Sequence, residues 1–81
     1  MVILYINDEH CSSVEQLRGY FNKEIKYGSP LFMDLVDYGR AGELAQWLME
    51  QGETELAKAV DSINEKTGDS EYISLLASAF L

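Results

Sequence analysis

Apolar residues in this chain form one short unbroken run, followed by groups spaced three and four residues apart. The run covers residues 2–6, is rich in β-branched and aromatic side chains, and is closed by Asn7 and Asp8. This composition predicts a β-strand followed by a turn, and residues 9–11 are expected to pair back as a brief second strand. Because a lone hairpin is marginal in water, it must pack on helices or pair with another chain.

Helical spacing begins directly after the hairpin. Ser12 precedes Glu15 by three positions, which is the arrangement of a capping box at a helix start. Apolar residues then recur at helical spacing, and Gly28 offers a stop through its access to left-handed backbone. We therefore expect a helix over about residues 13–26. Its buried face is expected to comprise Val14, Leu17, Phe21 and Ile25.

Glycines bracket the next two expected helices. Ser29 and Pro30 place a capping serine and a first-turn proline at the start of the second helix, and Gly39 is expected to end it. The third helix is expected between Gly42 and Gly52. Their buried positions are expected to be Leu31, Phe32, Leu35, Val36, Leu44, Ala45, Trp47 and Leu48.

The last third of the chain continues the same pattern. A fourth helix is expected over about residues 53–65, and a fifth is expected to follow a cap at Asp69 or Ser70. Short connections of this kind suit a compact bundle. The fold class is therefore mainly α, a single domain over residues 1–81. A hairpin occupies 1–11 and about five short helices occupy 12–81. The expected buried positions of the last two helices are Leu56, Ala57, Val60, Ile63, Tyr72, Ile73, Leu76 and Phe80.

The charge is strongly acidic and unevenly distributed. Fourteen Asp and Glu against six Lys and Arg give a net charge of −8, and residues 41–81 carry eight acids and two bases. Binding to nucleic acid needs cations that neutralise phosphates, and an anionic membrane would be repelled for the same reason. The charge therefore predicts no direct nucleic-acid or membrane binding. It favours a basic protein partner, including one whose own nucleic-acid groove is blocked by the interaction.

Cysteine use and hydropathy indicate a cytoplasmic protein. Cys11 is the single cysteine, so no intramolecular disulfide can form, whereas small secreted domains usually carry several. The apolar run at residues 2–6 is too short for the core of a signal peptide and lacks a basic leader. No stretch approaches the roughly 20 apolar residues that span a bilayer.

No motif predicts catalysis, a metal site or a cofactor. His10 and Cys11 are neighbours in an expected strand, so their side chains point to opposite faces, and no second ligand pair completes a zinc-type set. A calcium loop counted from Asp61 would place Ile63 at a ligand position and Lys66 where glycine is required. We therefore expect a protein that is not an enzyme. Acids at the helix starts are explained by the positive end of the helix dipole.

Residues 38–42 form the most distinctive short segment. Two glycines bracket Arg40, and Tyr38 precedes them. Arginine and tyrosine are enriched among interface hot spots, so this corner is a candidate contact site. The alternative, which we favour, is a tight turn between helices in which Arg40 faces the carbonyl end of the preceding helix.

These features predict a small acidic protein-binding module, an inhibitor or adaptor that presents an acidic helical face to a basic protein surface. The rival hypothesis is a structural self-association or scaffold domain whose acidity serves only solubility. In that case the apolar strand at residues 2–6 would pair two copies into a homodimer, since a free strand edge is a template for pairing. A small enzyme of unfamiliar type is the third hypothesis. The predicted partner-contact residues are Glu50, Glu53, Glu55, Asp61, Glu65, Tyr38 and Arg40.

Overall fold

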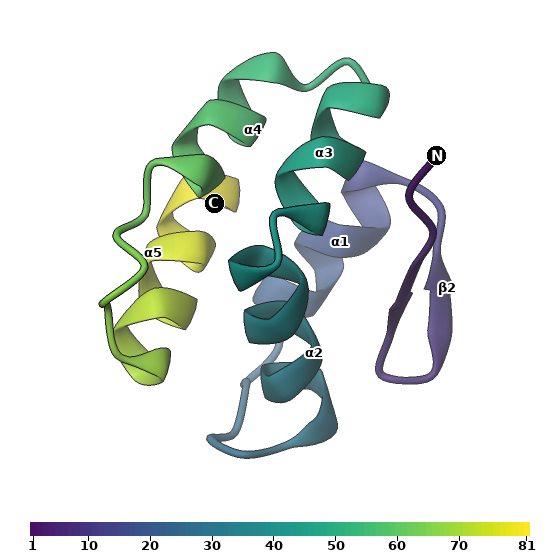
Figure 1. The fold of residues 1–81 in the computed structure, drawn as a ribbon. Coiled ribbons are helices and arrows are strands. Elements are labelled where there is room, and N and C mark those ends of the chain that lie inside the picture. The colour runs from purple at the N-terminus through teal and green to yellow at the C-terminus, as the bar shows by residue number, and fades with distance from the viewer.

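The computed structural model describes residues 1–81 as a β-hairpin followed by five helices (Figure 1). The predicted fold class, mainly α with an N-terminal hairpin, is confirmed. None of the helices is both long and apolar enough to cross a membrane. The elements in chain order are β1 (Leu4–Ile6), β2 (Glu9–Cys11), α1 (Val14–Phe21), α2 (Pro30–Arg40), α3 (Glu43–Glu50), α4 (Thr54–Asp61) and α5 (Asp69–Phe80).

A two-residue turn sets the geometry of the hairpin. Asn7 and Asp8 both have positive φ, 54° and 64°, which matches the twist of tight hairpin turns and is tolerated by Asn and Asp better than by most residues. The strands are antiparallel, with Leu4 opposite Cys11. Both of these side chains are buried, whereas Tyr5 between the inward residues of β1 lies on the outer face. The prediction of two short paired strands is confirmed.

The first helix is shorter than predicted. Its cap is Ser13, one residue later than expected, whose Oγ accepts a hydrogen bond from the backbone N–H of Gln16 at 3.1 Å. The helix ends at Phe21, well before the predicted end near residue 26. The ring of Phe21 stacks on Phe80 of α5 with 4.9 Å between centroids, and from there the chain turns back toward α2. Ile25 still packs on the core, but from an irregular segment.

Gly39 lies inside α2 rather than at its end, which corrects the prediction. A Cβ at this position would meet the ring of Tyr72, only 2.8 Å from Cε1, so glycine allows α5 to approach α2 closely. The helix continues through Arg40. The direction of the chain changes at Gly42, whose φ of 80° lies in the left-handed region that glycine adopts without strain.

The connection between α4 and α5 is longer than predicted. The fourth helix ends at Asp61 rather than near residue 65, and Gly68 occupies the cap position of the fifth. Asp69, a predicted cap, instead binds Arg40 with 2.8 Å between Oδ1 and Nη2. Residues 62–68 therefore owe their path partly to a contact with a distant helix, which local sequence patterns do not reveal.

One apolar core joins all seven elements. Nineteen residues are buried, and no charged side chain is among them. Every inward position predicted for the helices is either buried or packs against this core. Figure 1 shows the hairpin on one side of α2 and α3, with α4 and α5 on the other. The helix α2 contacts the hairpin, α3 and α5, so it is the central element of the packing.

Trp47 is the side chain whose loss we expect to cost most. It is 3% exposed on the inward face of α3, and removing a buried Trp side chain typically costs about 3–5 kcal/mol. We predict that Trp47→Ala lowers the free energy of unfolding by that amount in urea denaturation followed by circular dichroism, since the variant lacks the only Trp fluorophore. The exposed Met49 on the same helix is the control: Met49→Ala should change stability by less than about 0.5 kcal/mol. Equal effects of the two substitutions would contradict the assignment.

Candidate functional site

The structure divides the seven predicted contact residues between two regions. Arg40, Asp61 and Glu65 line one hollow beside α5, and Tyr38 lines the neighbouring hollow. The remaining three, Glu50, Glu53 and Glu55, lie where α3 ends and α4 begins. These three residues do not share a face with the other four. Glu53 and Glu55 lie at the start of α4, whereas Asp61 lies at its far end.

Glu50 is occupied by contacts within the chain. Its Oε1 accepts a hydrogen bond from the backbone N–H of Val2 at 3.0 Å, and Oε2 lies 3.9 Å from the amino group of Met1. The carboxylate thus joins the end of α3 to the segment before β1. This use makes Glu50 a weaker candidate for partner contact than the sequence suggested.

Glu53 and Glu55 lie at the start of α4, where acids are stabilised by the helix dipole. The side chain of Glu55 is 91% exposed and lies 4.0 Å from Lys58 in an exposed pair. Such pairs contribute little to stability. Both acids remain available to a partner.

Tyr38 joins the helical part to the hairpin. Its hydroxyl accepts a hydrogen bond from the backbone N–H of Tyr5 at 3.2 Å. One turn earlier on α2, Asp34 Oδ2 accepts the backbone N–H of Asn7 at 2.8 Å. These two bonds attach β1 and its turn to α2, so the polar atoms of Tyr38 and Asp34 are engaged within the protein.

Two acids that the sequence analysis did not select lie beside Tyr38. Asp37 and Glu43 line a hollow of about 310 Å³ together with Asp34, Tyr38 and Ala41. Neither Asp37 nor Glu43 has an ion-pair partner or a side-chain hydrogen bond. The signal in the sequence is that they flank the glycines at 39 and 42, where α2 and α3 meet.

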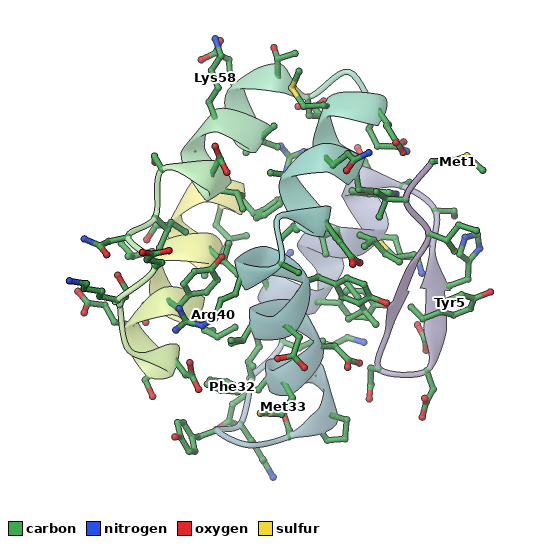
Figure 2. All side chains as sticks on the ribbon, viewed as in Figure 1. Met1, Tyr5, Phe32, Met33, Arg40 and Lys58 are labelled. Carbon is green, nitrogen blue, oxygen red and sulfur yellow. The ribbon has the colours of Figure 1, made fainter.

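Arg40 binds a segment far along the chain instead of the carbonyl end of its own helix, which corrects the interpretation of Arg40 as a helix cap. Its Nη1 donates to the backbone carbonyl of Glu65 at 2.9 Å, and Nη2 donates to the carbonyl of Thr67 and to Asp69. The guanidinium also lies 4.6 Å from the ring centroid of Tyr72. In Figure 2 its side chain extends from α2 toward α5 and the segment before it. The predicted hot-spot residue thus holds the α4–α5 connection in place.

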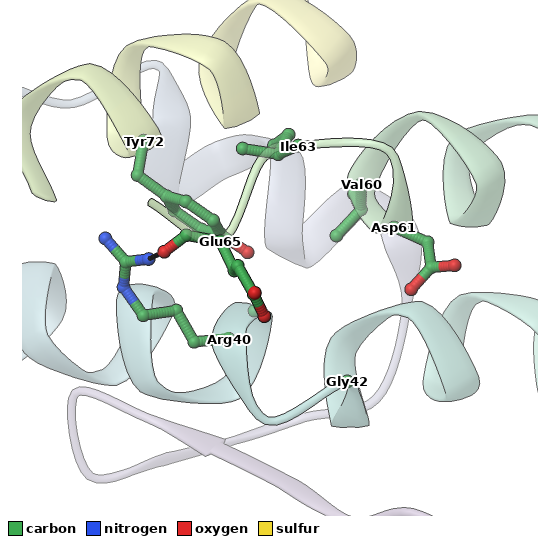
Figure 3. Close-up of a pocket in the computed structure, with 8 residues that line it drawn as sticks. Arg40, Gly42, Val60, Asp61, Ile63, Glu65 and Tyr72 are labelled. Atoms are coloured by element: carbon green, nitrogen blue, oxygen red, sulfur yellow. Dashed lines mark hydrogen bonds between the residues drawn. The ribbon is translucent and has the colours of Figure 1, made fainter. Parts of the chain in front are cut away.

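A hollow of about 380 Å³ lies between the ends of α2 and α4 and the side of α5. Figure 3 shows Arg40 and Tyr72 on one side of it and Asp61 on the other. Burial raises the pKa of Tyr72; the charge of Arg40 acts in the opposite direction, and Asp61 adds to the rise. We call this hollow the Tyr72 pocket. It is lined by Gly39, Arg40, Gly42, Val60, Asp61, Ile63, Glu65 and Tyr72.

Acids line both hollows. The Tyr72 pocket includes Arg40 and Gly42 of the α2–α3 turn, and the hollow beside Tyr38 includes Ala41 and Glu43. None of these acids forms an ion pair. We define the acidic corner as Asp37, Glu43, Asp61 and Glu65.

His10 and Cys11 do not form a joint site. Cys11 is buried, with Sγ 3.6 Å from the carbonyl of Ser13, and burial raises the pKa of its thiol. His10 faces outward and packs on the ring of Tyr5 with 5.5 Å between centroids. The predicted arrangement of an inward cysteine beside an exposed histidine is confirmed. No three His, Cys, Asp or Glu side chains are grouped so that they could hold a metal ion.

Comparison with protein-family models, curated proteins and solved structures gave no match to this chain.

Arg40 provides a test of the structural role assigned to it. We predict that Arg40→Ala lowers the free energy of unfolding by about 1–2 kcal/mol, because two acceptors in the connection and one at the start of α5 lose a charged donor that is still partly solvated. Amide hydrogen exchange within residues 62–68 should accelerate at the same time. Lys66→Ala is the matched control, since this exposed base lies in the same connection and its side chain forms no ion pair or hydrogen bond. An Arg40→Ala variant as stable as the control would show that the hydrogen bonds of Arg40 do not stabilise the fold.

Proposed function

We propose that this protein is a cytosolic protein-binding module, an inhibitor or adaptor, that presents its acidic corner to a basic surface of another protein. The observation that carries the proposal is that four unpaired carboxylates line the hollows beside the α2–α3 turn and the end of α4. Surface acids normally lie among bases of opposite charge, and single-sign surfaces are associated with electrostatic steering of partners.

The distribution of charge over the fold supports this proposal. Residues 30–65, which contain α2, α3 and α4, carry eight acids and two bases. Of the two bases, Arg40 is paired with Asp69, and Lys58 lies beside Glu55. Three of the other four bases, Arg18, Lys23 and Lys26, lie on α1 or the segment that follows it. A basic partner would therefore be attracted to one side of the molecule, with an orientation set before contact.

Charge reversal in matched pairs tests the proposal. We predict that Asp37→Lys with Glu43→Lys abolishes capture of the partner from cells that naturally make the protein, with partners identified by mass spectrometry. Capture by the unmodified protein should weaken steeply as salt rises, because exposed charges are screened. Glu15→Lys with Glu24→Lys changes the net charge by the same amount on α1 and the segment after it, so this control should retain the partner.

A third pair compares the two acidic regions. Glu53→Lys with Glu55→Lys should weaken capture less than the acidic-corner pair does. If the Glu53 and Glu55 pair alone removed the partner, the contact surface would lie at the start of α4 instead. If all three pairs left capture unchanged and salt had no effect, a charge-driven interaction would be excluded.

Self-association is the second candidate function, and the outer face of the hairpin favours it. Ile3 and Tyr5 are 51% and 57% exposed, side by side on this face. The strand edges are less open than the sequence suggested: the N–H of Tyr5 donates to Tyr38, and the carbonyl of His10 accepts from Gln16 Nε2 at 2.9 Å. Contact through the apolar face keeps these hydrogen bonds, whereas pairing along the edges competes with them.

A homodimer of this kind predicts a mass of twice 9.2 kDa in sedimentation equilibrium. Ile3→Lys should return the mass to that of one chain, because a charge would enter an apolar contact. Met33→Lys is the control: Met33 is also an exposed apolar residue, but it lies on α2 away from the outer face of the hairpin (Figure 2). A single-chain mass at all concentrations would remove this candidate and leave the acidic-corner proposal untouched.

A further inference from the structure

The hydroxyl of Tyr72 stands out among the tyrosines that pack against the core. The residue is 2% exposed, yet its hydroxyl makes no hydrogen bond with any protein atom. Tyr20 and Tyr38 contrast with it, because their hydroxyls pair with Glu9 and with the N–H of Tyr5. Buried hydroxyls are normally paired. No fully buried side-chain oxygen lacks a partner, so this hydroxyl reaches the open space of the Tyr72 pocket.

The side chains that line the pocket include two carboxylates against one base, so their net charge is negative, although at the Tyr72 hydroxyl itself the charge of Arg40 acts more strongly than that of Asp61. Arg40 is the one base in the pocket, but its guanidinium already donates to two backbone carbonyls and to Asp69, which neutralises it at 2.8 Å. Asp61 and Glu65 remain without ion partners. An anion would meet two unpaired carboxylates and an engaged arginine, whereas a cation would find acceptors.

The walls of the pocket fit an alkyl chain that carries such a cation. Val60 and Ile63 supply apolar surface, and Gly39 and Gly42 contribute no side chain. The three acceptor groups, the carboxylates of Asp61 and Glu65 and the hydroxyl of Tyr72, come from α4, the connection after it, and α5. Acceptors placed around one space suit the three N–H donors of a compact ammonium better than the planar fork of a guanidinium.

We infer that the Tyr72 pocket receives a lysine side chain of the basic partner, with Asp61, Glu65 and the Tyr72 hydroxyl accepting from its ammonium group. This inference deepens the proposed function and rests on it. Val60 and Ile63 cover the methylene stem, since lysine commonly buries its stem along apolar surface. Tyr72 thus acts as a specificity residue as well as a core residue.

The test uses the ¹⁵N-labelled protein and defined probes followed by NMR. Nα-acetyl-lysine amide should shift the amide signals of Gly39, Gly42 and Ile63 in a saturable manner. The norleucine analogue, which keeps a hydrocarbon side chain without the charge, should not shift them. The arginine analogue should bind more weakly. Asp61→Asn with Glu65→Gln should weaken lysine binding at least about tenfold, as expected when charged acceptors are lost.

Tyr72→Phe separates binding from folding. Because the hydroxyl makes no protein hydrogen bond, its removal should leave the melting temperature nearly unchanged while lowering lysine affinity several-fold. Glu53→Gln with Glu55→Gln is the matched control for the acid variant and should bind lysine normally. Shifts of equal size with norleucine, or unaltered lysine affinity in both pocket variants, would overturn the inference.

The capture experiment distinguishes this inference from the proposal on which it rests. If reversal of Asp37 and Glu43 removes the partner but the pocket variants retain it, the acidic corner binds without an inserted lysine. If lysine binds in the pocket but no acidic-corner reversal affects capture, the pocket serves a free amine and the partner assignment is wrong. Tighter binding of the arginine analogue would reject lysine as the occupant.

Discussion

The contact between Tyr72 and the end of α2 is the constraint on which the rest of the candidate surface depends. Gly39 leaves room for the Tyr72 ring, and Arg40 from the next position packs against that ring while binding the connection before α5. A Cβ at position 39 would clash with the Tyr72 ring, so the ring or the helix that carries it would have to shift. The pocket, the path of residues 62–68 and the position of Glu65 therefore follow from one close approach between two helices.

The same polar groups that make the chain acidic also hold it together. Asp34 and Glu50 accept backbone hydrogen bonds from the turn and the start of the hairpin, and Asp69 neutralises Arg40. Asp34 and Glu50 thus supply acceptors for backbone N–H groups that flank a sheet of only two strands. Once they are set aside, fewer acids remain without partners, and four of these define the acidic corner.

The surface was partly predictable. Tyr38, Arg40, Asp61 and Glu65 were selected from charge and residue type, and the fold brings all four to adjoining hollows. Glu43 had been explained by the helix dipole, Asp37 had not been selected as a contact residue, and Tyr72 had been assigned to the core alone. Periodicity identifies which side of a helix faces inward, but it carries no information on where the tip of an inward side chain emerges.

The sequence by itself determined the hairpin, the five helices and nearly all of the core, because turn chemistry and apolar spacing act over a few residues. It misplaced the ends of α1, α2 and α4. Near those ends Phe21, Gly39 and Glu65 contact Phe80, Tyr72 and Arg40, which lie far along the chain from them. Only the tertiary structure decided which acids are engaged and which are free. That distinction depends on distances between segments, and a linear pattern of charges does not contain them.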